Sequence, residues 1–226
     1  MTDKTKNGDF VEIEFTGIVK SDNTIFDTTD ESIAKKEGFY DPKQQYGPKT
    51  VCLGQGQLVK GLDDFAIGKD IGTEYEILIQ PEDGFGKKSA KLMKLVPTKI
   101  FTKDNIRPMP GLPVNIDGMY GIIRTVAGGR VIVDFNHPLS GKEIIYKFRI
   151  KRIVSDDKEK LESFLNMELG IKKEDIAFDS QTKTAKLKIK KKLPEEFAKV
   201  IEKKVSEIIP AVKKIEFIEG KEQQNT

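Results

Sequence analysis

The chain has one cysteine and one histidine, residue types that often act as nucleophiles, metal ligands or proton carriers. Cys52 stands between Val51 and Leu53 and has no second cysteine for a disulfide, so we expect a small buried apolar side chain rather than a nucleophile. His137 alone cannot build a multi-histidine metal site, and next to Pro138 we expect it to shape a turn. The residue types predict an activity that uses neither a metal ion nor a cofactor.

Positive charge is concentrated in one stretch of the chain. The net charge is only +3, but residues 87–130 hold nine Lys or Arg and only two Asp. Such a surface can face an anionic partner such as RNA. We favour a solvated basic surface and do not expect a nucleic-acid partner, because Phe101 and Tyr120 are the only aromatic residues there that bases could stack on.

Length and composition allow more than one domain. The chain has 226 residues, and single cores commonly hold about 100–150. Apolar residues make up 37% and charged residues 33%, which suits a soluble globular protein. No stretch approaches the roughly 18–20 uninterrupted apolar residues of a membrane span. The first ten residues are polar and do not resemble a secretory signal, so we expect a cytoplasmic protein without a membrane partner.

Hydrophobic periodicity predicts strands and one short helix in the first part of the chain. Residues 10–19 alternate between apolar and polar, and residues 21–23 have turn chemistry, which together predict a hairpin over residues 10–28. The further expected elements are a loop over 29–48, a strand over 51–53, a helix over 58–66 closed by Gly68, and a strand over 73–79.

The character of the sequence changes after residue 86. Residues 87–134 combine four prolines with short apolar pieces, which predicts a small β-rich domain inserted into a parent domain of residues 1–86 plus 135–154. Residues 142–154 would return the chain to the parent sheet as a long strand. Residues 155–219 predict a C-terminal domain of helix, strand, helix and strand, with a core so modest that dimerisation would complete it. We expect the polar residues 220–226 to be disordered.

Several short motifs, in this order, resemble the landmarks of FKBP-type peptidyl-prolyl cis/trans isomerases. They are Gly8 and Asp9; Phe15, Thr16 and Gly17; Phe26, Asp27, Thr28 and Thr29; Leu53, Gly54, Gln55 and Gly56; Leu58, Val59, Lys60, Gly61 and Leu62; and Gly84, Phe85 and Gly86. The insert that follows, with residues 133–142 at its end, resembles the SlyD branch of this family and its long archaeal relatives. The resemblance covers residues 7–154.

This resemblance implies an α+β fold, in which an FKBP-like antiparallel sheet wraps on a short helix. An inserted small β-rich domain and a C-terminal α/β domain of a dimerisation type would complete it. The implied activity is peptidyl-prolyl cis/trans isomerisation without a cofactor. An X-Pro bond isomerises against a barrier of about 18–20 kcal/mol that comes from amide resonance. An apolar pocket that binds the twisted amide more tightly than the planar one lowers this barrier without a nucleophile.

The resemblance also implies the residues of the pocket. The expected catalytic residues are Phe26, Asp27, Val59 and Phe85, and the further expected substrate contacts are Phe15, Leu58, Leu62, Leu139 and Tyr146. Asp27 would be the polar group at the rim, and a backbone N–H near Val59 would donate to the substrate carbonyl. Phe15 and Phe85 stand where relatives often have Tyr, so two phenolic hydroxyls are missing. Leu62 stands where eukaryotic members have Trp. The SlyD branch often has Leu at this position as well.

In SlyD-like proteins the insert holds unfolded chain near the pocket, and we expect the same here. The residues expected to be exposed for this purpose are Leu95, Val96, Ile100, Phe101, Met119 and Tyr120. The expected partners are unfolded or nascent polypeptides that contain proline, and a second copy of the chain bound through the C-terminal domain. Two alternatives stay open: a binding-only chaperone with a vestigial pocket, and a ribosome- or RNA-associated factor that uses the basic insert.

Overall fold

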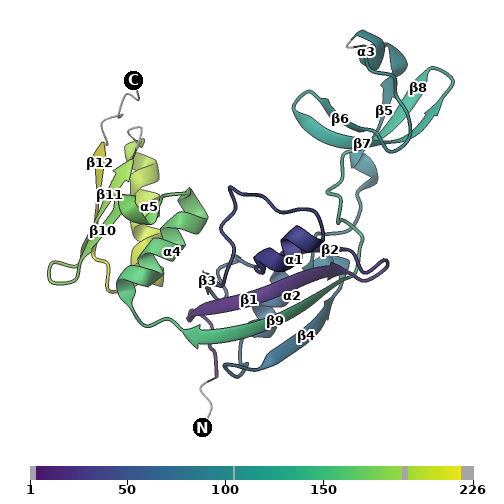
Figure 1. Ribbon diagram of the computed structural model, residues 1–226. Helices are drawn as coiled ribbons and strands as arrows, with labels where there is room; N and C mark the ends of the chain where they lie inside the picture. Colours follow the sequence, from purple (N-terminus) through teal and green to yellow (C-terminus); the bar gives the residue numbers. More distant parts are fainter. Residues whose placement is uncertain (1–3, 104, 190–192, 220–226) are drawn as a thin grey trace. The chain divides into compact units, whose positions relative to one another are not determined.

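The computed structural model describes residues 4–103, 105–189 and 193–219. Internal contacts divide the chain into two compact units. The first unit contains the chain up to Ile18, Ile25–Ile77, and everything from Tyr146 onward; the second contains Val19–Thr24 and Leu78–Ile145. Their helices and strands carry the labels of Figure 1. The tail predicted for residues 220–226 lies outside the described residues.

One five-stranded sheet forms the centre of the first unit. Its strands are β1 (Phe10–Val19), β2 (Ile25–Thr28), β3 (Lys49–Cys52), β4 (Glu74–Ile79) and β9 (Ile144–Ile153). Strands β2 and β3 pair antiparallel with β1, and the order β2-β1-β9-β4 places the returning strand β9 between β1 and β4. Val11, Ile13 and Ile150 are fully buried. The predicted hairpin and the predicted returning strand are therefore confirmed.

The helix predicted near Leu62 is confirmed as α2 (Lys60–Ala66). Leu62 is buried on its inner face. Phe65 packs edge-on against Tyr75 of β4 and Phe148 of β9, with ring centroids 6.4 and 6.1 Å apart. The sheet and this helix give the unit its mixed α+β character, as predicted.

A second short helix, α1 (Glu31–Lys36), occupies part of the stretch expected to be a loop, so that expectation is wrong there. The Asp30 side chain accepts hydrogen bonds from two backbone N–H groups of the first turn, which caps the helix. Ala34 is its one buried side chain. A helix of this length, held by its cap rather than by an apolar face, leaves no periodic signal in the sequence.

The second unit contains a four-stranded antiparallel sheet in the order β5-β8-β7-β6. Its elements are η1 (Pro81–Asp83), η2 (Ala90–Leu92), β5 (Met93–Pro97), α3 (Thr98–Lys103), β6 (Pro113–Ile116), β7 (Met119–Ala127) and β8 (Arg130–Asp134). The β-rich character is as predicted, but β5 and α3 were not predicted. Lys94 pairs with the buried Val133 in the middle of β5, and Pro97 ends the strand, so its apolar alternation is broken.

The C-terminal part of the first unit forms a three-stranded sheet with two helices on one face (Figure 1). Its elements are α4 (Asp157–Leu169), η3 (Lys173–Asp175), β10 (Ile176–Asp179), β11 (Thr184–Ile189), α5 (Glu195–Ile208) and β12 (Lys214–Glu219). β11 pairs antiparallel with β10 and parallel with β12. The helix, strand, helix and strand of the prediction are present, and β10 is an addition.

The core of this C-terminal part includes residues from the five-stranded sheet. Phe10, Cys52 and Val154 belong to the same buried cluster as Leu161 and Phe164 of α4. Cys52 is 1% exposed, and burial, followed by nearby acidic charge, raises the pKa of its thiol to about 11. Cys52 is therefore a small buried apolar side chain, as predicted, and it packs in the same core as α4.

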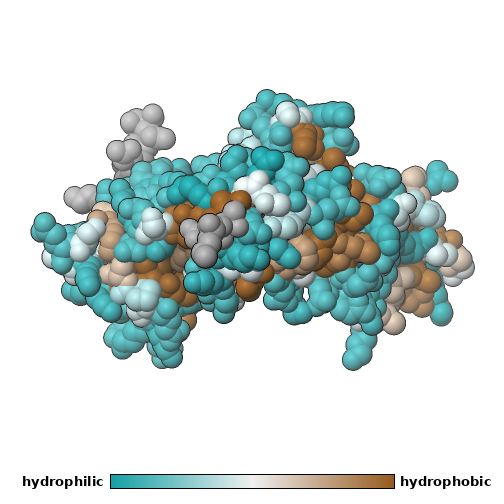
Figure 2. Space-filling view, turned by 90° about the horizontal axis from the view of Figure 1, so that it is seen from below, coloured by the Kyte–Doolittle hydropathy of each residue, from teal (hydrophilic) through white to brown (hydrophobic). Residues whose placement is uncertain are grey.

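On the face drawn in Figure 2, patches of apolar residues are exposed among hydrophilic ones. The most exposed of the large apolar residues are Val200, Tyr120, Leu95, Met109 and Phe197. None of the helices formed by the described residues has the length and apolar character to span a membrane.

Candidate functional site

Three aromatic rings from three strands meet in the first unit. Tyr146 of β9 packs edge-on against Phe15 of β1 and Phe26 of β2, with ring centroids 5.7 and 5.8 Å apart. Tyr146 is 2% exposed, whereas Phe15 and Phe26 are only half-buried. Edge-to-face packing fixes the rings relative to one another. The sheet thus brings three of the predicted site residues together, with Phe15 and Phe26 partly accessible and Tyr146 packed against both of them.

Gly17 makes this arrangement possible, and sequence reasoning gave it no role. A Cβ atom at Gly17 would lie 2.7 Å from Cζ of Phe26 and 3.0 Å from Cε1 of Tyr146. Gly17 pairs with Asp27 across the β1–β2 ladder, beside an irregularity in the register. The motif of Phe15, Thr16 and Gly17 could have signalled it, since a glycine inside a strand marks close approach of another group.

Asp27 brings the one carboxylate of the predicted site to these rings. Burial raises the pKa of Asp27, while a hydrogen bond from the backbone N–H of Thr28 and the charge of Lys49 act in the opposite direction. Burial, and then the charge of Asp27, raises the pKa of Tyr146. The Tyr146 side chain is therefore a neutral phenol near pH 7, and the site has apolar walls with a single acidic group.

The loop that carries Leu58 and Val59 is held by the side chain of Asp63, another residue that sequence reasoning missed. Asp63, on α2, is 5% exposed, and its carboxylate accepts hydrogen bonds from the N–H groups of Gly54 and Gly56 at 2.9 and 3.1 Å. Leu58 and Val59 are half-buried where this loop enters α2, whereas Leu62 is fully buried. Leu62 thus lies beneath the loop, and its predicted contact with substrate stays a prediction.

The first unit also has a hollow that shares only Phe15 with the aromatic cluster described above. It has a volume of about 830 Å³ and includes Phe15 but none of Phe26, Asp27 or Tyr146. Two ion pairs lie within its lining, Glu74 with Arg149 and Glu76 with Lys147, and the lining residues Glu14 and Glu31 pair with lysines outside it. Such a hollow has little unpaired chemistry to offer a ligand.

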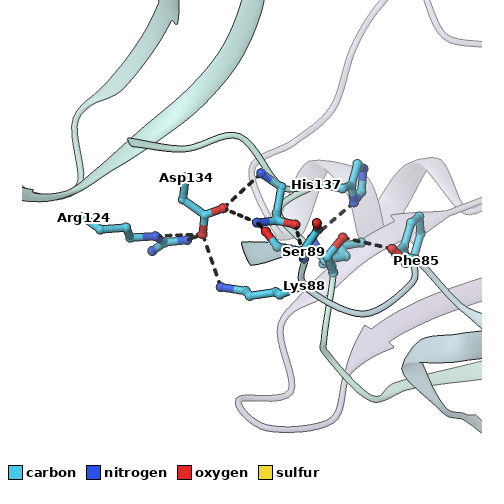
Figure 3. Close-up of polar contacts among 9 residues, drawn as sticks. Phe85, Lys88, Ser89, Arg124, Asp134 and His137 are labelled. Atoms are coloured by element: carbon cyan, nitrogen blue, oxygen red, sulfur yellow. Dashed lines mark hydrogen bonds and ion pairs between the residues drawn. The ribbon is translucent and has the colours of Figure 1, made fainter. Parts of the chain in front are cut away.

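Two predicted site residues, Phe85 and Leu139, belong to the second unit, and both are half-buried there. The chain enters the insert after Phe85 and leaves it before Leu139, and hydrogen bonds tie these two segments together. The Ser140 hydroxyl donates to the carbonyl oxygen of Phe85 at 2.9 Å, the bond drawn at Phe85 in Figure 3. The Gly141 N–H donates to the carbonyl oxygen of Gly86 at 2.8 Å. The backbone of Phe85 is therefore held by the outgoing segment.

Asp134 anchors the same junction on the side of the insert (Figure 3). Its side chain is 2% exposed and accepts hydrogen bonds from Arg124, Lys88 and Asn136. Burial opposes ionisation, but these bonds, first those from Asn136, lower the pKa of Asp134 to about 2. Asn136 in turn bonds both backbone groups of Ser89. Two of the basic residues counted above thus serve a structural ion pair.

The six insert residues predicted to be exposed fall into two groups. Leu95, Ile100, Met119 and Tyr120 are exposed by between 37% and 57%. Val96 and Phe101 are 7% and 2% exposed and form the core of the insert, so the expectation that they are exposed is wrong. A domain of this size needs some of its few large apolar residues for its own core.

The described residues contain no group of three or more His, Cys, Asp or Glu side chains that could hold a metal ion. The chemistry available is that of apolar walls, one carboxylate and backbone groups.

Comparison with known proteins points in the same direction. Residues 2–102 match the family described as FKBP-type peptidyl-prolyl cis-trans isomerase, and residues 94–139 match the family described as FKBP26, IF domain. The short-type peptidyl-prolyl cis-trans isomerase of Methanocaldococcus jannaschii is 30% identical over 159 residues, which cover 70% of this chain and 100% of that protein.

Bacterial relatives match a shorter part of the chain. The FKBP-type 16 kDa peptidyl-prolyl cis-trans isomerase of Escherichia coli is 31% identical over 111 residues, 47% of this chain and 74% of that protein. The FKBP-type isomerase SlyD of Haemophilus influenzae is 29% identical over 116 residues, 46% of this chain and 56% of that protein. With its sheet, its aromatic cluster and these matches, the chain belongs to the family of FKBP-type peptidyl-prolyl cis-trans isomerases.

Proposed function

We propose that the substrate proline binds against the aromatic surface of Phe15, Phe26 and Tyr146, with Asp27 at the rim. The observation that carries this proposal is the convergence of these rings with a single half-buried carboxylate. The family resemblance implies further substrate contacts at Val59 and Phe85. The expected substrates are X-Pro bonds of unfolded or nascent polypeptides. That the reaction takes place in the cytoplasm stays a prediction from the sequence.

The physical basis of catalysis in such a site is selective binding of the twisted amide. A planar amide is more polar than a twisted one, because resonance places partial charges on its oxygen and nitrogen. Apolar ring walls solvate those charges poorly, so they favour the twisted form relative to water. The phenol of Tyr146 stays uncharged, and Asp27 supplies the only acidic group. No proton transfer to substrate is required.

This proposal is tested by NMR exchange measurements on a Leu-Pro or Phe-Pro tetrapeptide. Wild type should accelerate exchange. Phe26→Ala should lower kcat/KM by about tenfold or more, since burying such a side chain contributes roughly 1.5–3 kcal/mol. Asp27→Ala should lower it as well, whereas Asp41→Ala, which removes an exposed carboxylate of the same unit, should not. A folded wild type without catalysis would leave the cluster as a binding site only, and full activity of Phe26→Ala would remove it from the site.

We further propose that the insert binds unfolded chain on the open face of its sheet. Leu95 lies opposite Ile132, and Ile132 shares its side of β8 with Asp134, which lies opposite Ile122. Tyr120 is two residues before Ile122, so it faces the same side as Leu95. Leu95 and Tyr120 are 56% and 57% exposed. The opposite face is covered by the core, and Arg124 and Lys88 pair with Asp134 at one end of this face, which leaves the part around Leu95 and Tyr120 for a client.

The C-terminal domain is proposed to bind a second copy of the chain. A groove of about 200 Å³ between α4 and α5 is lined mainly by apolar residues. Phe197 and Val200 on its border are 50% and 62% exposed. In a two-fold dimer, Phe197 and Val200 of each copy can insert into the groove of the other copy, which would bury both side chains.

Light scattering at several protein concentrations tests this dimer. Wild type is expected to have twice the mass of the chain, and Val200→Glu to be monomeric, because an acid at this position would be buried without a partner. Lys199→Gln, a change at an exposed neighbour on the same helix, should leave the mass unchanged. A monomeric wild type at all concentrations would remove the proposal.

A further inference from the structure

The imidazole of His137 lies flat against the ring of Phe85. The two ring centroids are 4.8 Å apart and the ring planes differ by only 5°. His137 is exposed and Phe85 is half-buried, so the imidazole shields one face of a phenyl ring that would otherwise meet more solvent. This contact joins the segment that enters the insert to the segment that leaves it.

The orientation of the imidazole is fixed by a second interaction. The backbone N–H of Leu139 donates to Nδ1 of His137 at 3.2 Å (Figure 3). In the neutral ring the proton therefore sits on Nε2. This bond closes the turn expected from the sequence, and it also sets the plane in which the ring stacks.

The remaining contacts of the junction restrain the backbone on both sides of this pair. The Ser140 hydroxyl and the Gly141 N–H hold the carbonyl groups of Phe85 and Gly86. Asn136, the residue immediately before His137, is held by hydrogen bonds from its backbone N–H and its side-chain amide to Asp134. With its own backbone restrained, His137 can restrict the side-chain angles of Phe85, which backbone hydrogen bonds do not set.

We propose that His137 is a positioning residue for peptidyl-prolyl isomerisation, which acts by holding the ring of Phe85 in the orientation that substrate meets. The inference rests on the proposed function, in which Phe85 contacts the substrate. His137 thereby has two roles: its ring stacks on Phe85, and its Nδ1 accepts the hydrogen bond that closes the turn. Stacking of aromatic rings changes equilibria by about two- to tenfold, which sets the size of the expected effect.

Two substitutions separate the stack from the turn. His137→Phe keeps a ring that can stack on Phe85 and removes the acceptor for the Leu139 N–H. His137→Asn keeps a side-chain acceptor for an N–H two residues further on and removes the ring. If the ring positions Phe85, His137→Asn lowers kcat/KM for a Leu-Pro tetrapeptide by about three- to tenfold and His137→Phe retains most of the activity. Activity that survives in His137→Asn and falls in His137→Phe would overturn the proposal in favour of the turn.

The ring of Phe85 gives a readout that does not depend on turnover. Stacking on an aromatic ring shifts the ring-proton NMR signals of Phe85 upfield, and this shift should persist in His137→Phe and vanish in His137→Asn. An unchanged shift in His137→Asn would contradict the proposal even if that variant lost activity through lower stability. Urea unfolding of both variants gives their stabilities for comparison.

Phe85→Ala separates failure of this inference from failure of the proposed site. It should lower kcat/KM, and adding His137→Asn to it should cause little further loss, because the ring to be positioned is gone. If Phe85→Ala impairs turnover and His137→Asn does not, His137 has no positioning role although the site stands. If Phe85→Ala has no effect, Phe85 is not part of the site and the inference falls with it.

Discussion

Gly17→Ala is expected to lower kcat/KM for a tetrapeptide by about 100-fold, because a displacement of about 1 Å in a substrate-binding group can cost that much. The new methyl carbon would lie 2.7 Å from Cζ of Phe26, whereas carbon atoms in contact prefer about 3.5–4.0 Å. The ring of Phe26 must therefore move by about 1 Å to restore a normal contact. Tyr146, whose Cε1 is 3.0 Å from the same point, limits the directions in which it can move.

A matched control exists in the insert. Gly121→Ala creates a contact of the same severity, since its Cβ would lie 2.7 Å from Cγ1 of Val133 and 2.8 Å from Cδ1 of Phe135. It should destabilise the core of the insert and leave tetrapeptide turnover within about twofold of wild type. NMR exchange measures turnover, and urea unfolding measures stability. Normal turnover by a folded Gly17→Ala protein would show that the position of the Phe26 ring does not matter for catalysis.

Catalysed refolding of a protein limited by X-Pro isomerisation is expected to slow by more than about tenfold when Leu95 and Tyr120 are both replaced by serine. Holding a client on the insert raises its effective concentration at the pocket, so loss of the holding contacts reduces the rate on a protein but not on a short peptide. The two side chains are 56% and 57% exposed, so their replacement does not open a cavity in the core. Tetrapeptide turnover should therefore stay within about twofold.

Thr102→Ser, an exposed change on α3, is the control for this pair. Replacing residues 88–133 with a short linker should also slow protein refolding, since it removes the whole sheet that carries Leu95 and Tyr120. Refolding rates can be followed by fluorescence of the client protein. Protein refolding at the wild-type rate in either variant would sink the assignment of the open face as the client site.

The sequence by itself determined the strands of the main sheet, the helix α2 and the order of the family landmarks. Each of these leaves a local mark: alternation with a period of two in β1, helical spacing around Leu62, and a glycine after the helix end. It also brought Phe15, Phe26 and Tyr146 into one expected pocket, although only through resemblance to a family. Periodicity alone does not say which strands become neighbours.

Tertiary structure decided which residues meet, and this changed the interpretation of several of them. Lys88 and Asp134 are 46 residues apart, yet they form one ion pair at the junction. Val96 and Phe101 looked like binding residues, but their small domain uses them as core.

The same holds for residues whose function depends on a distant partner. In the sequence Gly17 is one residue of a predicted strand, whereas in the fold its missing Cβ leaves room for the rings of Phe26 and Tyr146. Phe10 and Cys52 belong to the sheet by sequence and to the α4 core by contact. The physical reason is that a side-chain pattern records which face of an element is buried, whereas the partner on that face is set by chain segments far away in sequence.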